Sequence, residues 1–124
     1  MNLEVGMNNK VNLIRLLLIV CVILNPVTVL AHSILVKSKP AKDEVLTASP
    51  KLIEVWFNEG VRSEYKALAV IDDQGKRVDN KDIEQGLTDR SYLYASVPEL
   101  SPGTYTVRYR VVSQDTHIVT GKYK

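Results

Sequence analysis

Two histidines, His32 and His117, are the residues of this sequence best suited to metal chemistry, and they are the only two histidines present. Asp115 precedes His117 by two positions, so on an extended segment both side chains would project from one face. If the chain is cleaved after Ala31, His32 becomes the first residue and offers its α-amine and its imidazole Nδ1 to one ion. Together these groups make three nitrogen donors and one oxygen donor. This set suits Cu(II) in a tetragonal plane, and the Irving–Williams order favours copper over the other divalent ions.

A simpler interpretation competes with this one. A single histidine in a strand is more often a surface or hydrogen-bonded residue than a ligand, and an Asp-x-His spacing occurs by chance. The positions favour the metal hypothesis, because one histidine would form the new terminus and the other stands beside a carboxylate near the last predicted strand.

Residues 1–31 are predicted to be a signal peptide that is removed. They contain an apolar block in which only residues 16–24 are uninterrupted, which is too short to span a bilayer as a stable helix. Val29 and Ala31 stand at positions −3 and −1 of the expected cleavage point. Cleavage there leaves residues 32–124 as a mature, exported domain of 93 residues.

The composition of residues 32–124 excludes several functions. The chain's only cysteine and both methionines lie before residue 32, so the domain has no disulfide, no thiolate ligand and no thioether for Cu(I). Fourteen basic and thirteen acidic residues are scattered along it, which argues against nucleic-acid binding. A domain of this size has one modest core, so no small organic substrate is expected.

The pattern of the domain predicts short strands and no sustained helix. Apolar and polar residues alternate between turn signals, and Asp73-Gln74-Gly75 is a hairpin-type turn in which Gly75 is expected to have a positive φ. Asn80–Thr88 is open to two interpretations, a loop or a loop with a short helical turn. The fold class is therefore all-β: an antiparallel Greek-key β-sandwich, immunoglobulin-like or a small cupredoxin-like barrel. The predicted strands cover residues 33–37, 51–58, 67–72, 91–97, 104–111 and 116–122.

Both ends of the domain resemble one known family. The segment AHSILVKSKPAKDEVLTASPKLIEVWFNEGV resembles the beginning of CopC/PcoC-type copper-resistance proteins, and SPGTYTVRYRVVSQDTHIVTGKY resembles their closing segment. The resemblance implies one Cu(II) ion per mature chain, held by His32, Asp115 and His117. It also places Glu59 close to that ion. The family's second, methionine-rich Cu(I) site has no counterpart in residues 32–124.

The resulting hypothesis is an exported, non-enzymatic Cu(II)-binding protein that acts in copper homeostasis or resistance as a carrier or buffer. It would work in the periplasm, or at the extracytoplasmic face of the membrane in a Gram-positive cell. The resemblance implies a membrane copper transporter of the CopD type as a candidate partner, or the domain as the exported module of such a transporter.

The alternative is an oxidative copper enzyme with an N-terminal histidine brace, similar to a small lytic polysaccharide monooxygenase. The short chain argues against it, because little of it is left for a flat substrate-binding surface. Asp115 in the copper plane would also occupy coordination room that oxygen needs.

Overall fold

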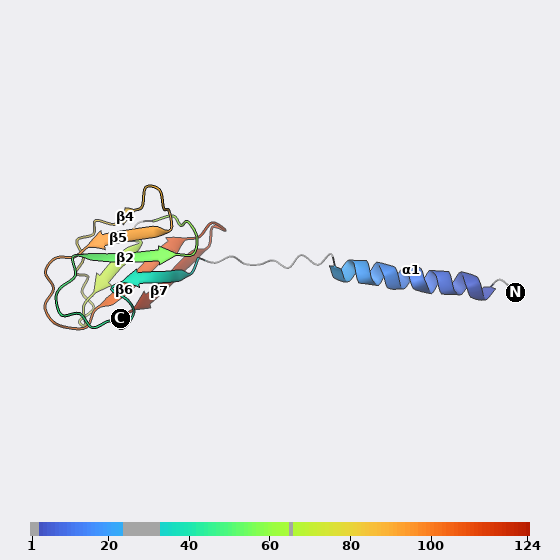
Figure 1. Cartoon of the computed structure of the whole chain (residues 1–124), viewed down its shortest axis with the longest axis horizontal. Helices are drawn as coiled ribbons and strands as arrows, with labels where there is room; N and C mark the ends of the chain where they lie inside the picture. Colours follow the sequence, from blue (N-terminus) through green and yellow to red (C-terminus); the bar gives the residue numbers. More distant parts are fainter. Residues whose placement is uncertain (1–2, 24–32, 65) are drawn as a thin grey trace.

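The computed structural model describes residues 3–23, 33–64 and 66–124 (Figure 1). The first element is the helix α1, Leu3–Ile23, which Figure 1 draws apart from the strands. Among the described residues, no helix combines the length and the apolar character needed to cross a membrane. Ala31 and His32 lie outside the described residues, so cleavage between them stays a prediction.

The rest of the described chain forms two antiparallel sheets that pack as a β-sandwich (Figure 1). Non-consecutive strands are neighbours in both sheets, as β2 and β5 or β3 and β6 show, so the chain crosses repeatedly between the layers. The all-β sandwich predicted from the sequence is confirmed. The first sheet has the order β1 (Leu35–Lys39), β2 (Leu52–Phe57), β5 (Tyr92–Ser96) and β4 (Glu84–Gln85); the second has the order β3 (Leu68–Ile71), β6 (Thr106–Val112) and β7 (Ile118–Tyr123).

Alternating apolar residues of β2, β5 and β6 build the core between the sheets. Val55 of β2 pairs in register with Leu93 of β5, and both side chains are fully buried. Val107 and Val111 of β6 face them from the second sheet and are also buried. The alternation predicted from the sequence is therefore confirmed in these strands, because alternation decides which side of a strand faces the core.

The terminal strands begin later than the sequence predicts. The strand predicted at residues 33–37 is β1, Leu35–Lys39, and the one predicted at 116–122 is β7, Ile118–Tyr123. In both places the residues left out of the strand make other contacts. Ser33 bonds to the Glu59 side chain and the Ile34 amide bonds to the Asn58 side chain, while Thr116 and His117 belong to a turn.

The long connection after β3 confirms one local prediction and corrects another. Gly75 has a φ of 81°, and its amide donates to the Asp72 carbonyl, as expected for the predicted turn. The helical alternative for Asn80–Thr88 is wrong. This segment is a loop that contains the two-residue strand β4, which pairs with β5.

Asp79 is the buried polar anchor of this connection. Its carboxylate accepts hydrogen bonds from the Val70 amide (3.0 Å), from the Arg77 guanidinium (2.8 and 2.9 Å) and from the Lys81 amide (3.1 Å). Burial alone would raise the pKa of Asp79, but the hydrogen bonds and charge of Arg77, with the Val70 amide, hold that pKa below its usual value. The carboxylate thereby fixes the connection against β3.

We expect Asp79→Asn to destabilise the fold by about 2 kcal/mol near neutral pH, because an amide nitrogen would then face hydrogen-bond donors. Since the pKa of Asp79 is lowered in the folded state, its contribution is present above the unfolded-state value and is lost as the pH falls through the folded-state pKa. Urea denaturation of the wild type and the variant should therefore converge in acid. Asp73→Asn, at an exposed turn position, is the control; an equal loss in both variants would contradict the role given to Asp79.

Candidate metal site

The turn between β6 and β7 positions Asp115 and His117. Val112 and Ile118 are the last register partners of the hairpin, and residues 113–117 connect them. The Ser113 amide donates to the His117 carbonyl (2.9 Å), and the Thr116 amide donates to the Ser113 carbonyl (3.0 Å). Thr116 has a φ of 69°, a left-handed conformation that is rare for a β-branched residue. The expectation that Asp115 and His117 share one face of an extended segment is therefore wrong, because a tight turn occupies these positions.

The turn nevertheless brings the two side chains into contact. His117 Nδ1 lies 2.9 Å from Asp115 Oδ2, and the His117 amide lies 3.3 Å from Asp115 Oδ1. The Ser113 hydroxyl donates to the same Oδ1 atom. The Ser113 hydroxyl, first, and the His117 ring lower the pKa of Asp115 far below its usual range, so this carboxyl group is ionised at neutral pH.

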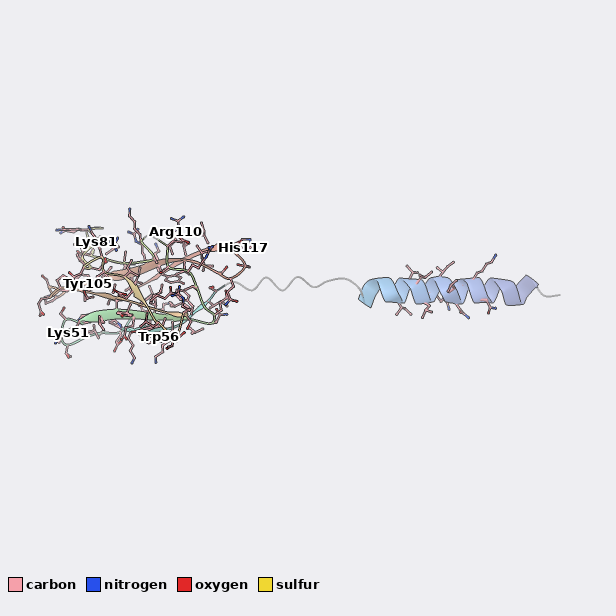
Figure 2. The ribbon with its side chains drawn as sticks, turned by 90° about the horizontal axis from the view of Figure 1, so that it is seen from above. Lys51, Trp56, Lys81, Tyr105, Arg110 and His117 are labelled. Atoms are coloured by element: carbon pink, nitrogen blue, oxygen red, sulfur yellow. The ribbon has the colours of Figure 1, made fainter. Side chains whose placement is uncertain are left out.

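The separation within the Asp115–His117 pair is that of a hydrogen bond, and it is also compatible with two neighbouring ligands of one metal ion. Two donors that lie about 2.0 Å from an ion and at right angles to each other are about 2.8 Å apart. The observed 2.9 Å between His117 Nδ1 and Asp115 Oδ2 matches that edge of a square plane. The side chains are also accessible, since 57% of His117 and 27% of Asp115 is exposed. Figure 2 shows His117 at one end of the sandwich.

Glu59 joins the beginning of the described domain to this turn. Its Oε1 atom accepts a hydrogen bond from the Ser33 hydroxyl (2.7 Å) and lies 3.5 Å from the Gln114 amide nitrogen. Ser33 is buried, with 2% of its surface exposed. Asn58 supports the same link, because it exchanges hydrogen bonds with the backbone of Ile34 in both directions. The residue that follows His32 is therefore held beside the turn that carries Asp115.

The described residues contain part of the predicted ligand set. Asp115 and His117 are brought together, and Glu59 lies next to the turn through Gln114. His32 lies outside the described residues. Within residues 33–64 and 66–124, no group of three or more His, Cys, Asp or Glu side chains is arranged to hold a metal ion.

The sequence did not reveal the supporting roles of Ser33 and Ser113. Both are buried serines whose hydroxyl groups bond to acidic residues of the site. The only hint in the sequence is that each serine lies within two residues of a candidate ligand. The partner of Ser33 is 26 residues away, so this contact leaves no local pattern.

These features define a small β-sandwich with a hairpin-borne Asp–His pair at one end, and comparison with known proteins assigns its family. Residues 35–124 match the model of the CopC domain, so the chain belongs to the CopC domain family. Protein YobA of Escherichia coli is 31% identical over 97 residues, which are 77% of this chain and 78% of YobA. The copper transport protein CutJ of Bacillus subtilis is 28% identical over 107 residues, which are 86% of this chain but 20% of CutJ.

Solved structures agree with this assignment. CopC from Methylosinus trichosporium OB3b superimposes with a TM-score of 0.69 at 38% identity, over 74% of this chain and 89% of CopC. PcoC, a methionine-rich copper resistance protein from Escherichia coli, gives a TM-score of 0.63 at 28% identity, over 75% and 95% of the two chains. The predicted family is confirmed. So is the prediction of a non-enzymatic protein, because members of this family are not enzymes.

We expect Glu59→Ala to lower the free energy of unfolding by about 2 kcal/mol, because the buried Ser33 hydroxyl would lose its acceptor. Ser33→Ala alone should cost less, and the double variant should be no less stable than Glu59→Ala. Denaturation of the wild type, the two single variants and the double variant gives a double-mutant cycle. Its coupling free energy measures the Ser33–Glu59 interaction. Glu99→Ala, at an exposed loop position, is the control. Additive effects of the two substitutions would show that Glu59 does not act through Ser33.

Proposed function

We propose that residues 32–124 act outside the cytoplasm as a Cu(II)-binding protein, a carrier or buffer in copper homeostasis. One Cu(II) ion would be held by the α-amine and imidazole of His32 with the side chains of Asp115 and His117. The observation that carries this proposal is the contact between His117 Nδ1 and Asp115 Oδ2, whose 2.9 Å separation suits adjacent donors of a tetragonal plane.

The link through Glu59 supports the inclusion of His32. One peptide bond joins His32 to Ser33, and the Ser33 hydroxyl is bonded to Glu59 beside the Gln114 amide. A free amine at position 32 would therefore start close to the turn that carries the other donors. Glu59 itself accepts these hydrogen bonds through Oε1, and its additional role as a ligand stays a prediction.

The relatives support copper as the ion and a membrane transporter as the partner. PcoC is a copper resistance protein, and CutJ is a copper transport protein of which the matched region forms 20%. A domain of this kind within a longer transport protein suggests that the present domain delivers copper to, or collects copper from, a membrane transporter of the CopD type.

The first test is a Cu(II) titration of the protein with a free His32 amine. We expect one ion per chain and an EPR spectrum with strong nitrogen coupling, because three donors are nitrogens. One extra residue before His32 should weaken binding at least several tens-fold, about 2 kcal/mol or more, since the amine becomes an amide. His117→Ala should weaken binding strongly, and Asp115→Asn less, because water can replace a carboxylate oxygen.

Asp82→Asn provides the matched control for Asp115→Asn. Asp82 is also a loop carboxylate that accepts hydrogen bonds from a serine, Ser96. However, Ser96 pairs with Leu52, at the end of β2 opposite to Phe57 and Glu59. Its substitution should leave Cu(II) affinity unchanged. Affinity that is indifferent to the extra N-terminal residue would refute the amine chelate.

The second test concerns oxidation state. Residues 32–124 contain no cysteine or methionine, so they lack the soft donors that Cu(I) prefers. We expect the protein to lose Cu(I) to a chelator of moderate affinity under reducing conditions while it retains Cu(II) in air. Retention of Cu(I) in that competition would show that the two histidines suffice for both oxidation states.

A further inference from the structure

The outer face of the β3–β6–β7 sheet concentrates positive charge. Arg108 and Arg110 of β6 and Lys122 of β7 are exposed, and they alternate with the core residues Val107 and Val111 and the buried Tyr123. They therefore project from the side of the sheet that faces away from the core. We call Arg108, Arg110 and Lys122 the basic face.

Two members of the basic face oppose each other directly. Arg108 and Lys122 are partners in the β6–β7 register, and Arg110 follows two residues along the same face. Like charges opposite each other on neighbouring strands destabilise a sheet. Within the part of the chain that the structure describes, no carboxylate forms an ion pair with any of the three. The sheet thus retains an unfavourable pair that the described chain does not compensate.

The positive charge extends beyond the strands. One hollow on this side is lined by the basic face together with Lys66 and Arg77, and none of its lining residues is acidic. A second hollow shares Lys66 and Arg77 and adds Lys81, with Glu64 as its only acidic lining residue. Asp79 balances the charge of Arg77, so the positive charge that matters here is that of Lys81 and the basic face.

The rest of the lining indicates which kind of partner fits. Apart from its cations, the first hollow is lined by Ala69, Thr120, Gly121 and the half-buried Tyr109. Protein interfaces usually have an apolar or aromatic centre that becomes buried. The lining of this hollow has no large exposed apolar side chain, and the exposed Ile118 lies outside it at the beginning of β7. Anionic lipid headgroups require only positive charge spread over a surface, because they move laterally to meet it. A sheet face whose three exposed cations, Arg108, Arg110 and Lys122, form no ion pair with a described carboxylate therefore fits a lipid surface better than a protein.

We propose that the basic face docks the protein on anionic lipid headgroups at the extracytoplasmic surface of a membrane. Figure 2 shows Arg110 and Lys81 along one side of the sandwich, Lys51 and Trp56 along the opposite side, and His117 at the end near Arg110. Docking through the basic face therefore holds the β6–β7 turn close to the membrane plane. This arrangement does not depend on copper, so it can be tested separately from metal binding.

The experiment measures sedimentation of the protein, as processed and purified from expressing cells, with vesicles of phosphatidylcholine alone or mixed equally with phosphatidylglycerol. We expect binding to the anionic vesicles at low ionic strength and its loss at about 0.5 M salt. Replacing all three residues of the basic face by Gln should weaken that binding on the order of 100-fold, because each cation near an anionic surface contributes about fivefold. Any retained apolar leader would raise binding to both vesicle types. The difference in binding between anionic and neutral vesicles therefore measures the electrostatic contribution.

The matched control is the triple variant Lys37→Gln, Lys39→Gln and Lys51→Gln. It removes the same charge from exposed positions on the other sheet and its border, and it should bind the anionic vesicles within a few-fold of wild type. Equal losses in the two triple variants would reduce the effect to net charge and overturn the proposal. No preference for anionic vesicles would also overturn it, as would binding of an acidic protein but not of vesicles. Thermal denaturation and Cu(II) titration of each variant check that the fold and the metal site are intact.

Discussion

A single carboxylate oxygen, Oε1 of Glu59, connects the beginning of the domain to the turn between its last two strands. It accepts a hydrogen bond from buried Ser33 and approaches the Gln114 amide, so segments more than 50 residues apart meet at one point. This contact fixes the position of the chain next to the proposed metal site. A chelating N-terminus needs a fixed starting point, because a mobile chain end loses conformational freedom on binding. The Ser33–Glu59 bond and the Asn58–Ile34 hydrogen bonds order this part of the chain during folding. Less conformational entropy is then lost when an ion binds.

The structure uses carboxylates with lowered pKa values in two different ways. Asp79 is buried, and four hydrogen-bond donors together with the charge of Arg77 maintain its ionisation; its role is to hold a long connection against β3. Asp115 lies in an accessible turn, where the Ser113 hydroxyl and the His117 ring stabilise its charge. In the proposed site, a Cu(II) ion would take the place of the hydrogen bond between the Asp115 carboxylate and the His117 ring. Asp79 has no such role, because all its partners belong to the fold.

Local patterns predicted most of the fold, whereas the contacts that build the site depend on distant residues. Alternation identified the inward faces of β2, β5 and β6, because a strand has only two sides. Alternation also led us to expect the Asp115 and His117 side chains on one face of an extended strand. The two side chains are in contact, but a turn brings them together and not an extended strand. The roles of Ser33 and Ser113 could not be predicted, because a hydroxyl group bonds to whatever the tertiary structure places beside it. The loop at Asn80–Thr88 was ambiguous for a similar reason: its two-residue strand exists only because β5 offers an edge.

Charge shows the same difference between sequence and structure. Along the chain the cations are scattered among nearly as many acids, and this pattern predicts no charged surface. In the fold, the two-residue period of β6 and the register of β7 place Arg108, Arg110 and Lys122 together, and the hollow that they line contains no acidic residue. A nearly neutral domain can therefore present a strongly cationic side. Repulsion between Arg108 and Lys122 on neighbouring strands lowers the stability of the isolated domain. An anionic surface would relieve this repulsion and attract both side chains. Both residues lie on the hairpin whose turn carries Asp115 and His117. The same two strands would therefore fix the position of the proposed copper site relative to the proposed membrane surface.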